Sequence, residues 1–384
     1  MRLPHEERGI VEVAQTGAPR ITLIVASMSG GGVERAALNL AAEFRDKGYR
    51  VDLVLVRAEG PLLDQLPEGV NLVKLEVSRA AWGILPLRGY LRSAQPDLVI
   101  GFAFAVNLMV SLSAWGRLRP RRLVLSVHST ITREFAEQPP LWRAVLFAAT
   151  RLLYRRADHI VCVSQGAASD LHRAIGLDRR RIQVIHNPVI VDQTNHGPKD
   201  EVLESGSKSL VNQSRPLVLA AGRLTEAKNF SLFLSAFALV RQEIDCRAMI
   251  LGIGPQKESL ERLADQLGIS DYLTFAGFQA DPWPFYRRAS VFVLSSSWEG
   301  LPTVLIEAMS AGTPVVATDC PHGPREILCD GRWGMLVAVD DVQALAAAII
   351  RTLRSGGIDA RLRSRDFNAT LIAEEYLTIC GMAE

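Results

Sequence analysis

The sequence predicts an α/β protein made of two successive βα domains, each able to form a parallel sheet. Apolar strand-like runs alternate with helical segments in both halves of the chain, and a polar, turn-rich stretch separates the halves. A chain of 384 residues is also too long for one ordinary domain. With 48% hydrophobic and 22% charged residues, the chain can bury large cores, which excludes a disordered protein.

The expected N-terminal domain covers residues 21–193 and follows a flexible tail at 1–20 that has no signal-peptide run. Its first strand, at 21–28, leads into a glycine-rich turn with Gly31 and Gly32, a helix and a strand at 51–56, which is a βαβ unit. The glycine spacing differs from the G-x-G-x-x-G dinucleotide fingerprint and disfavours NAD. Further strands are expected at 70–75, 97–102, 122–127, 159–164 and 182–187.

The second half repeats the alternation after a polar linker at 194–215, which has no sustained apolar periodicity. Residues 216–360 form the expected C-terminal domain, and a C-terminal helix within 361–384 is expected to pack back toward the N-terminal domain. Strands of this domain are expected at 216–223, 247–254, 272–277, 289–294, 313–318 and 334–339.

The apolar stretch at 98–116 approaches the length of a membrane span. Gly101 and Asn107 divide it into a strand and a helix, so we expect a buried βα unit instead. Five widely spaced cysteines without a Cys-x-x-Cys motif indicate reduced thiols in a cytoplasmic protein.

The net charge of +2 is unevenly distributed along the chain. Up to Gln193 there are 25 basic and 18 acidic residues, against 18 and 23 in the remainder. Arginines interspersed with apolar residues between 117 and 181 fit an anionic membrane surface. They fit the solvated face of ordinary helices equally well, so both interpretations stay open at this point.

The segment 295–307, SSSWEGLPTVLIE, carries two carboxylates, Glu299 and Glu307, across a turn that opens into a helix. Pro302 is expected at the first helical position, where its missing N–H costs nothing. The first helical amides and the helix dipole then make an anion site suited to a phosphate. One carboxylate before the helix and one inside it can contact two hydroxyl-bearing parts of a ligand whose phosphates lie between them, as in a nucleotide sugar.

Two cations follow another strand of the same domain. Arg223 ends this strand and Lys228 comes five residues later, a pair suited to a pyrophosphate. Gly254 ends a further strand and leaves room for a nucleotide to approach the backbone. In the N-terminal half, His128 ends the strand at 122–127 in a position that faces the expected crevice. No His or carboxylate grouping has metal-ligand spacing, and no nucleophile elbow is present.

Taken together, these motifs resemble the family-4 retaining glycosyltransferases (glycosyl transferases group 1), which have the GT-B fold of two Rossmann-like domains facing a central cleft. The resemblance runs from about Ile21 to Val339. It rests on the segments GGVER, SVHS, IHNPV, AAGRLTEAKN, LGIGP, SSSWEGLPTVLIEAMSAGTPVVATD and GPREIL.

The resemblance implies roles for individual residues. Glu299 would contact the donor sugar, Glu307 the ribose, and Arg223 and Lys228 the diphosphate, with His128 near the sugar. The donor site would also include Gly31, Gly32, Gly254 and the helix start at Leu301, Pro302 and Thr303. Because these cations and amides can stabilise the leaving diphosphate, no metal or other cofactor is expected.

The expected activity is transfer of a hexose or N-acetylhexosamine from a nucleotide sugar, with retention of the anomeric configuration. The resemblance implies that the nucleotide is UDP. The acceptor would be a glycan or lipid-linked glycan in cell-surface polysaccharide or glycolipid synthesis. The expected location is the cytoplasm or the inner face of the membrane, without nucleic-acid partners. Two alternatives remain: a GT-B nucleotide-sugar epimerase, and a catalytically silent scaffold that binds nucleotide sugar.

Overall fold

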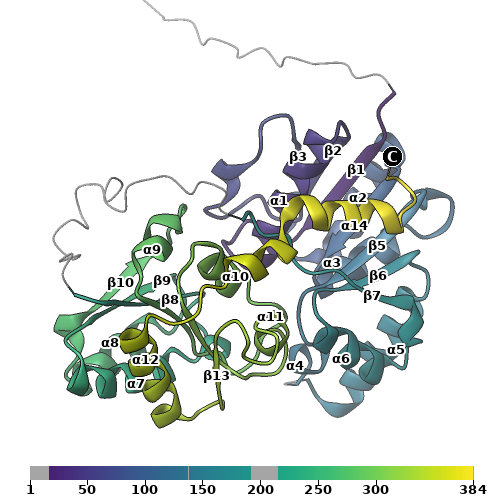
Figure 1. Cartoon of the computed structure of the whole chain (residues 1–384). Coiled ribbons are helices and arrows are strands. Elements are labelled where there is room, and N and C mark those ends of the chain that lie inside the picture. The colour runs from purple at the N-terminus through teal and green to yellow at the C-terminus, as the bar shows by residue number, and fades with distance from the viewer. Residues whose placement is uncertain (1–16, 137, 192–214, 384) are drawn as a thin grey trace, which may run out of the picture.

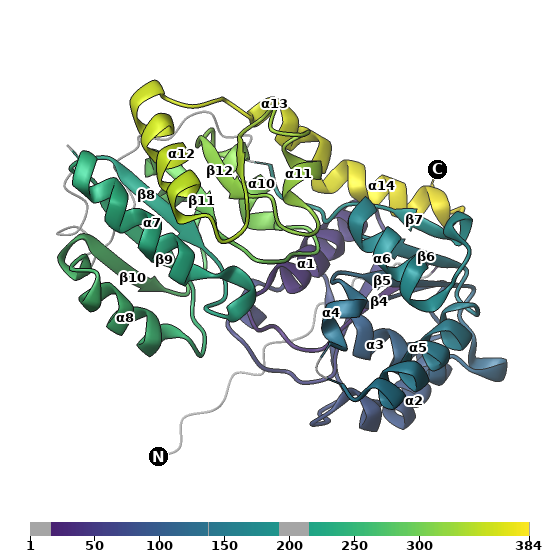
Figure 2. The same cartoon turned by 90° about the horizontal axis from the view of Figure 1, so that it is seen from below.

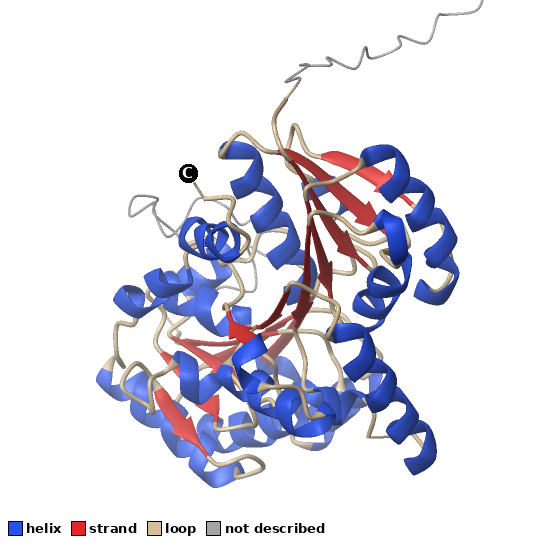
Figure 3. Ribbon diagram, turned by 90° about the vertical axis from the view of Figure 1, so that its right-hand side faces the viewer, coloured by secondary structure: helices blue, strands red, loops and turns tan. Residues whose placement is uncertain are grey.

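The strands of this protein are short apolar runs buried on both faces, which is typical of parallel sheets covered by helices. The computed structural model describes residues 17–136, 138–191 and 215–383. In β1, every residue from Ile21 to Val25 is buried. All strand pairs in the described residues are parallel and form two sheets, so the predicted α/β class with two parallel-sheet domains is confirmed (Figures 1 and 3).

The N-terminal sheet has the order β3-β2-β1-β4-β5-β6-β7. Because the order reverses between β1 and β4, the loops after these strands open a crevice at the carboxyl edge of the sheet. Its strands are β1 (Arg20–Val25), β2 (Arg50–Leu55), β3 (Asn71–Lys74), β4 (Leu98–Phe102), β5 (Arg122–Val127), β6 (His159–Cys162) and β7 (Ile182–Val184). Its helices are α1 (Gly32–Asp46), α2 (Ile84–Ala94), α3 (Phe104–Ser113), α4 (Ile131–Glu134), α5 (Pro140–Tyr154) and α6 (Gln165–Ile175).

The C-terminal sheet has the order β10-β9-β8-β11-β12-β13, with the reversal between β8 and β11. Its strands are β8 (Leu217–Ala221), β9 (Arg247–Leu251), β10 (Leu273–Gly277), β11 (Val291–Leu294), β12 (Val315–Thr318) and β13 (Met335–Val337). Its helices are α7 (Phe230–Glu243), α8 (Lys257–Gln266), α9 (Trp283–Arg288), α10 (Thr303–Ser310), α11 (Pro324–Ile327) and α12 (Val342–Ser355). Loops that leave β8 and β11 therefore lie side by side at the carboxyl edge.

Short 3₁₀ turns complete the connections in both domains. They are η1 (Leu63–Gln65), η2 (Ala80–Gly83), η3 (Gly116–Leu118), η4 (Arg179–Arg181), η5 (Glu226–Lys228), η6 (Ser270–Tyr272) and η7 (Arg365–Phe367).

The C-terminal end of the chain, α13 (Arg361–Ser364) and α14 (Ala369–Ile379), returns from the second domain to the first. Ile372 and Tyr376 of α14 join the buried core that contains Phe44 of α1 (Figure 1). Two segments of the chain cross between the domains side by side. They are joined by a hydrogen bond of 2.9 Å from the backbone amide of Val189 to the carbonyl of Phe367. Both crossings therefore form one connection between the domains.

The apolar stretch at 98–116 folds as β4 and α3, a strand and a helix, as the sequence predicts. No helix in the described ranges combines the length and apolar character that crossing a membrane requires. Residues 1–16 of the expected tail and 194–214 of the expected linker lie outside the described residues.

Candidate active site

Lys228 and Glu299 form an ion pair between the loops that follow the neighbouring strands β8 and β11. Lys228 Nζ lies 2.5 Å from Glu299 Oε1, which also accepts a 2.6 Å hydrogen bond from Ser296 Oγ. The Lys228 and Glu299 side chains are 20% and 10% exposed. Charge-assisted hydrogen bonds in this partly buried setting hold the carboxylate in one orientation.

The two loops are tied together by their own hydrogen bonds. Ser295 Oγ donates to the carbonyl of Lys228 at 2.9 Å, and the amide of Ser297 donates to the carbonyl of Ala227 at 2.8 Å. Asn229, which also caps α7, donates from Nδ2 to Ser297 Oγ at 3.1 Å. These contacts give the ion pair a rigid base, although its partners are 71 residues apart in the sequence.

Helix α10 begins beside Glu299 with free amide groups. It begins at Thr303, so Pro302 is the residue before the helix, one position earlier than predicted. The ψ angle of 96° at Pro302 is extended, because the chain turns there to enter the helix. No side chain caps α10, and the amides of Thr303 and Val304 donate to no acceptor in the described part of the chain. Such a helix start attracts an anion.

The start of α1 in the N-terminal domain meets the start of α10. A side chain at Gly32 would come within 3.1 Å of Thr303 Oγ1, and one at Gly31 within 2.6 Å of the Glu34 carboxylate. Two helix N-termini, one from each domain, thus approach each other where the sequence places the phosphates. A side chain at Gly32 would press on the Thr303 side chain across the domain boundary, whereas one at Gly31 would displace the Glu34 carboxylate within its own domain.

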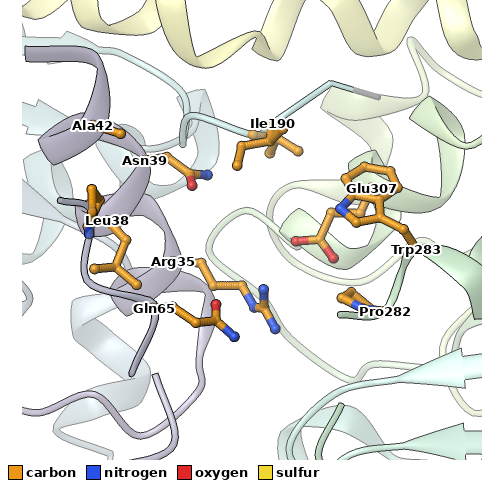
Figure 4. A pocket seen from close by; sticks show the side chains of 11 residues that line it. Arg35, Leu38, Asn39, Ala42, Gln65, Ile190, Pro282, Trp283 and Glu307 are labelled. Atoms are coloured by element: carbon orange, nitrogen blue, oxygen red, sulfur yellow. The ribbon is translucent and has the colours of Figure 1, made fainter. Parts of the chain in front are cut away.

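Glu307 lies inside α10 and lines a pocket between the domains, with a cavity volume of about 170 Å³. Its Oε2 accepts a 2.8 Å hydrogen bond from the hydroxyl of Tyr286 in α9. Arg35 of α1 reaches across the same pocket and donates to the carbonyl of Gln279 at 3.3 Å. Figure 4 shows Arg35 on one side of the pocket and Glu307 with Trp283 on the other.

Burial raises the pKa of Glu307, while the charge of Arg35 and the hydrogen bond from Tyr286 oppose the rise. Burial also raises the pKa of Tyr286 well above its usual value, and the adjacent Glu307 carboxylate adds to the effect. Tyr286 therefore stays a hydrogen-bond donor at neutral pH. The carboxylate keeps one oxygen for a ligand, in a pocket that mixes polar and aromatic side chains.

His128 follows β5 and is buried under the loop that carries Glu299. Its ring stacks on Phe102 and its Nε2 lies 2.9 Å from Ser126 Oγ. A side chain at Gly300 would come within 2.0 Å of the His128 carbonyl oxygen, so the two loops are in contact. Burial lowers the pKa of His128 to about 4, which makes it a neutral imidazole at neutral pH.

His128 Nδ1 and Asn187 Oδ1 are buried polar atoms that have no hydrogen-bond partner within 3.5 Å in the described ranges. Asn187 still lies near enough to oppose the lowering of the His128 pKa. A buried polar atom without a partner costs about 1–3 kcal/mol, so a ligand hydroxyl that bonded to it would recover much of that cost.

The positions of the remaining predicted residues, Arg223, Gly254 and Leu301, do not by themselves indicate a contact with the donor. The Arg223 side chain is exposed, and its guanidinium has no hydrogen-bond or ion-pair partner among the described residues. A side chain at Gly254 would come within 2.4 Å of the Leu224 carbonyl, so packing of two loops already requires glycine there. Leu301 is buried next to the start of α10. Within the described ranges, no group of three His, Cys, Asp or Glu residues is arranged to hold a metal.

Arg35, Tyr286 and Ser296 were not among the predicted site residues. Arg35 belongs to the GGVER segment and Ser296 to the SSSWEG segment, so their position beside predicted residues was an available signal. Tyr286 lies 21 positions before Glu307 on another helix, and its contact with Glu307 depends on the packing of α9 against α10.

Two family models match the chain in succession. The Glycosyltransferase Family 4 model matches residues 30–193, and the model of Glycosyl transferases group 1 matches residues 203–367.

Individual relatives agree with these matches. The lipopolysaccharide core biosynthesis glycosyltransferase LpsE of Rhizobium meliloti is 33% identical over 60% of this chain and 66% of its own length. A Campylobacter jejuni α-1,4-N-acetyl-D-galactosaminyltransferase, whose name gives an undecaprenol-diphosphate-linked glycan, is 27% identical over 94% of this chain and 98% of its own. In three of the relatives, LpsE among them, the match spans 59 to 66% of the relative's length.

The fold is shared with solved structures. Anabaena HepE, crystallised with UDP and glucose, superposes with a TM-score of 0.77 at 20% identity and covers 94% of this chain and 99% of its own.

Proposed function

The chain belongs to the family-4 glycosyltransferases and has the GT-B fold; from this membership and the site geometry we propose that it transfers a hexose or N-acetylhexosamine from UDP to a glycan or lipid-linked acceptor. Transfer proceeds with retention and serves cell-surface polysaccharide or glycolipid synthesis. The enzyme works on the cytoplasmic side of the membrane.

The observation that carries the proposal is the ion pair of Lys228 and Glu299 beside the uncapped start of α10. Breaking a glycosyl phosphate bond leaves negative charge on the diphosphate. Lys228, the exposed Arg223 and the free amides of Thr303 and Val304 supply positive charge and donors for that group without a metal. Glu299, oriented by Lys228 and Ser296, accepts hydrogen bonds from hydroxyls of the donor sugar.

The pocket around Glu307 binds the nucleoside in this proposal. The free oxygen of Glu307 accepts from the ribose hydroxyls, and Trp283 adds an aromatic surface for the base. Uracil is favoured because HepE, which shares the fold, was crystallised with UDP. The diphosphate then lies over the start of α10, between Glu299 and Glu307.

Retention is explained by transfer on one face of the sugar. The departing phosphate, held at the start of α10, takes the proton of the acceptor hydroxyl as that oxygen bonds to the anomeric carbon. The neutral His128, which lies under the loop of Glu299, contributes Nδ1 as a hydrogen-bond partner for a sugar hydroxyl in this proposal. In this mechanism, the protein supplies positioning and charge stabilisation and forms no covalent bond to the sugar.

A membrane-bound acceptor is supported by the solvent-facing side of α5. Leu141 and Trp142 of this helix are 78% and 62% exposed, and Val145 and Leu152 continue the exposed apolar face. The helix lies on the outside of the N-terminal domain (Figure 2). Exposed apolar side chains on an arginine-bearing helix suit the interface of an anionic bilayer. The Campylobacter relative is named for a lipid-linked acceptor, which agrees with this surface.

A nucleotide-release assay across UDP- and GDP-linked hexoses and N-acetylhexosamines tests the proposal. We expect slow release of UDP from one sugar, accelerated by an undecaprenol-diphosphate-linked glycan, with the anomeric configuration of the donor kept in the product. Inversion of the sugar at C2 without nucleotide release would identify an epimerase. Donor binding without any turnover, with or without acceptor, would identify a silent scaffold and refute the proposal.

A further inference from the structure

A second pocket lies at the amino edge of the N-terminal sheet, away from the candidate active site. Its volume is about 400 Å³, and its lining includes Arg119, Arg155, Arg156 and Arg181 together with Asp158. Asp158 immediately precedes β6, whereas His128 of the active site follows the carboxyl end of β5. A strand of six residues spans about 20 Å, so the two sites lie at opposite edges of the sheet.

The arginines of this pocket outnumber the groups that neutralise them. Arg119 forms a 2.7 Å ion pair with Asp158, and Arg181 donates to the carbonyls of Arg155 and Ala157 at the end of α5. Arg156 lies 3.6 Å from the centre of the Trp115 ring. The Arg155 guanidinium has no partner among the described residues. The lining of this pocket thus contains four guanidinium groups and one carboxylate, that of Asp158.

An excess of guanidinium groups around a cavity attracts an anion, and the forked donors of arginine match phosphate oxygens in particular. None of these arginines lies in the catalytic site, so the leaving diphosphate does not explain them. The carbonyl groups of Arg155 and Ala157, just after α5, already accept from Arg181. The guanidinium N–H groups of Arg155, and those of Arg156 at the edge of its stack on Trp115, have no acceptor among the described residues and can donate to a bound phosphate.

Exposed apolar side chains lie next to the pocket. Leu112, Trp115 and Leu152 are 39%, 43% and 59% exposed. Leu112 and Trp115 flank the lining residue Ala114, and Leu152 precedes Arg155 by less than one turn of α5. A free phosphate ion makes no contact with these apolar side chains. A phospholipid does, because its acyl chains lie directly below its phosphate.

Helix α5 connects this pocket with the active-site edge of the domain. It leads from β5 to β6 and therefore runs back from the carboxyl edge of the sheet to the amino edge. Its 15 residues span about 22 Å, with Leu141 and Trp142 at one end and the arginines at the other. A bilayer along this helix would touch the apolar face and the pocket together.

We propose that the arginine pocket binds the phosphate of an anionic lipid headgroup and anchors the amino end of the sheet at the membrane. The apolar face of α5 then lies in the interface, and the pocket determines how the domain is rotated on the bilayer. This inference rests on the membrane contact in the proposed function, but it does not depend on the sugar-transfer reaction.

The experiment measures retention of the full chain on vesicles of phosphatidylcholine with 30% phosphatidylglycerol in 0.15 M salt. The pocket variant is Arg155→Gln/Arg156→Gln. The matched control is Arg50→Gln/Arg92→Gln, which removes the same charge from exposed positions of the same domain. We expect about 30-fold weaker binding for the pocket variant and less than threefold for the control. Thermal melting establishes that both variants are folded.

Equal losses in the two variants would show that only net charge matters and would overturn the proposal. Titration with inorganic phosphate tests the other source of the same chemistry. Saturable phosphate binding that is lost in the pocket variant, with vesicle binding unchanged, would also overturn it. UDP release by the pocket variant is measured in parallel. If UDP release by the pocket variant equals that of the wild type, this pocket is separate from catalysis. If neither the wild type nor the variants release UDP, the proposed activity is contradicted, and vesicle binding alone then tests the lipid site.

Discussion

The two halves of the candidate active site are built differently. The C-terminal domain contributes charged side chains, and hydrogen bonds from adjacent loops hold them in place, as for Glu299 between Lys228 and Ser296. The N-terminal domain contributes mainly close backbone contacts, with Gly32 against Thr303 and the His128 carbonyl against Gly300. The C-terminal half thus supplies the ion pair of the site, and the N-terminal half adds Arg35, His128 and the contacts that bring the domains together. Mutations of the ion pair and of the contacts should therefore affect turnover and domain contact separately.

The largest effect is expected where the charge is removed from the C-terminal half. Lys228→Met should lower kcat for UDP release by about 100- to 1000-fold, because the leaving diphosphate loses a cation. Steady-state kinetics measure this. Lys257→Met, at an exposed lysine near Glu261, is the control and should stay within about twofold of the wild type. A change confined to KM would contradict the assignment of Lys228 to the leaving group.

Closure is tested by Gly300→Ala. The added methyl group would lie 2.0 Å from the His128 carbonyl oxygen, so the domains must move apart. We expect kcat/KM to fall by about 10- to 100-fold, because displacement of the reacting groups by about 1 Å is enough for such a loss.

Small-angle scattering should show a larger radius of gyration for Gly300→Ala. In Gly89→Ala, the control, the new methyl group meets nothing within 4 Å, and the variant should be fully active. Wild-type activity in Gly300→Ala would mean that this contact is not part of the active arrangement.

Glu307→Gln should weaken binding of the donor nucleotide and at the same time raise the stability of the folded protein above neutral pH. We expect roughly tenfold weaker binding of UDP, through loss of a charged hydrogen bond to the ribose. Because burial raises the pKa of Glu307, the folded state binds its proton more tightly than the unfolded state does. The free energy of unfolding of the wild type therefore falls as pH rises from the ordinary pKa of glutamate through the raised pKa of Glu307.

The Tm of Glu307→Gln should accordingly exceed that of the wild type at pH 8, and the gap should close near pH 4. Calorimetry at the two pH values measures the difference. Glu68→Gln, at an exposed position, provides the control and should show no such gap. A lower Tm for Glu307→Gln at pH 8 would contradict the burial argument.

The smallest effect concerns His128, whose pKa is lowered to about 4 by burial. The unfolded state binds a proton near pH 6.5 and the folded state only near pH 4, so stability should be lost as pH falls between these values. Urea unfolding at pH 7 and pH 5 should show a smaller loss for His128→Gln than for the wild type. An identical loss in both proteins would mean that His128 is not protonated on unfolding in this range, and His159→Gln serves as the comparison.

Much of the fold was predictable because it follows from local patterns. Apolar runs such as 21–25 and 98–102 are strands, and the glycine-rich turn after β1 opens α1 as expected. The turn that leads from Glu299 into α10 was also predictable, since these residues are contiguous in sequence, and its role as donor site stays a prediction. Pro302 was placed one residue too far into the helix, because its fixed φ suits both the position before a helix and the first helical position.

Gly254 shows where a sequence signal has more than one cause. A glycine after a strand is compatible with close approach of a ligand, but here the carbonyl of Leu224 occupies the space of a side chain. The position of Arg35 opposite Glu307 depends on how the domains meet, and no local pattern contains that information. The same holds for the Tyr286 hydrogen bond to Glu307.

By itself, the sequence determined the two-sheet architecture and predicted a donor site at the segment with Glu299 and Glu307 and at the cations Arg223 and Lys228. These follow from periodicity and short-range spacing, which are properties of contiguous residues. Only the tertiary structure decided that Lys228 pairs with Glu299, that the starts of α1 and α10 meet, and that four arginines surround one pocket. The physical reason is that each of these contacts joins segments from different strands or domains, and their distance is set by packing of the whole chain.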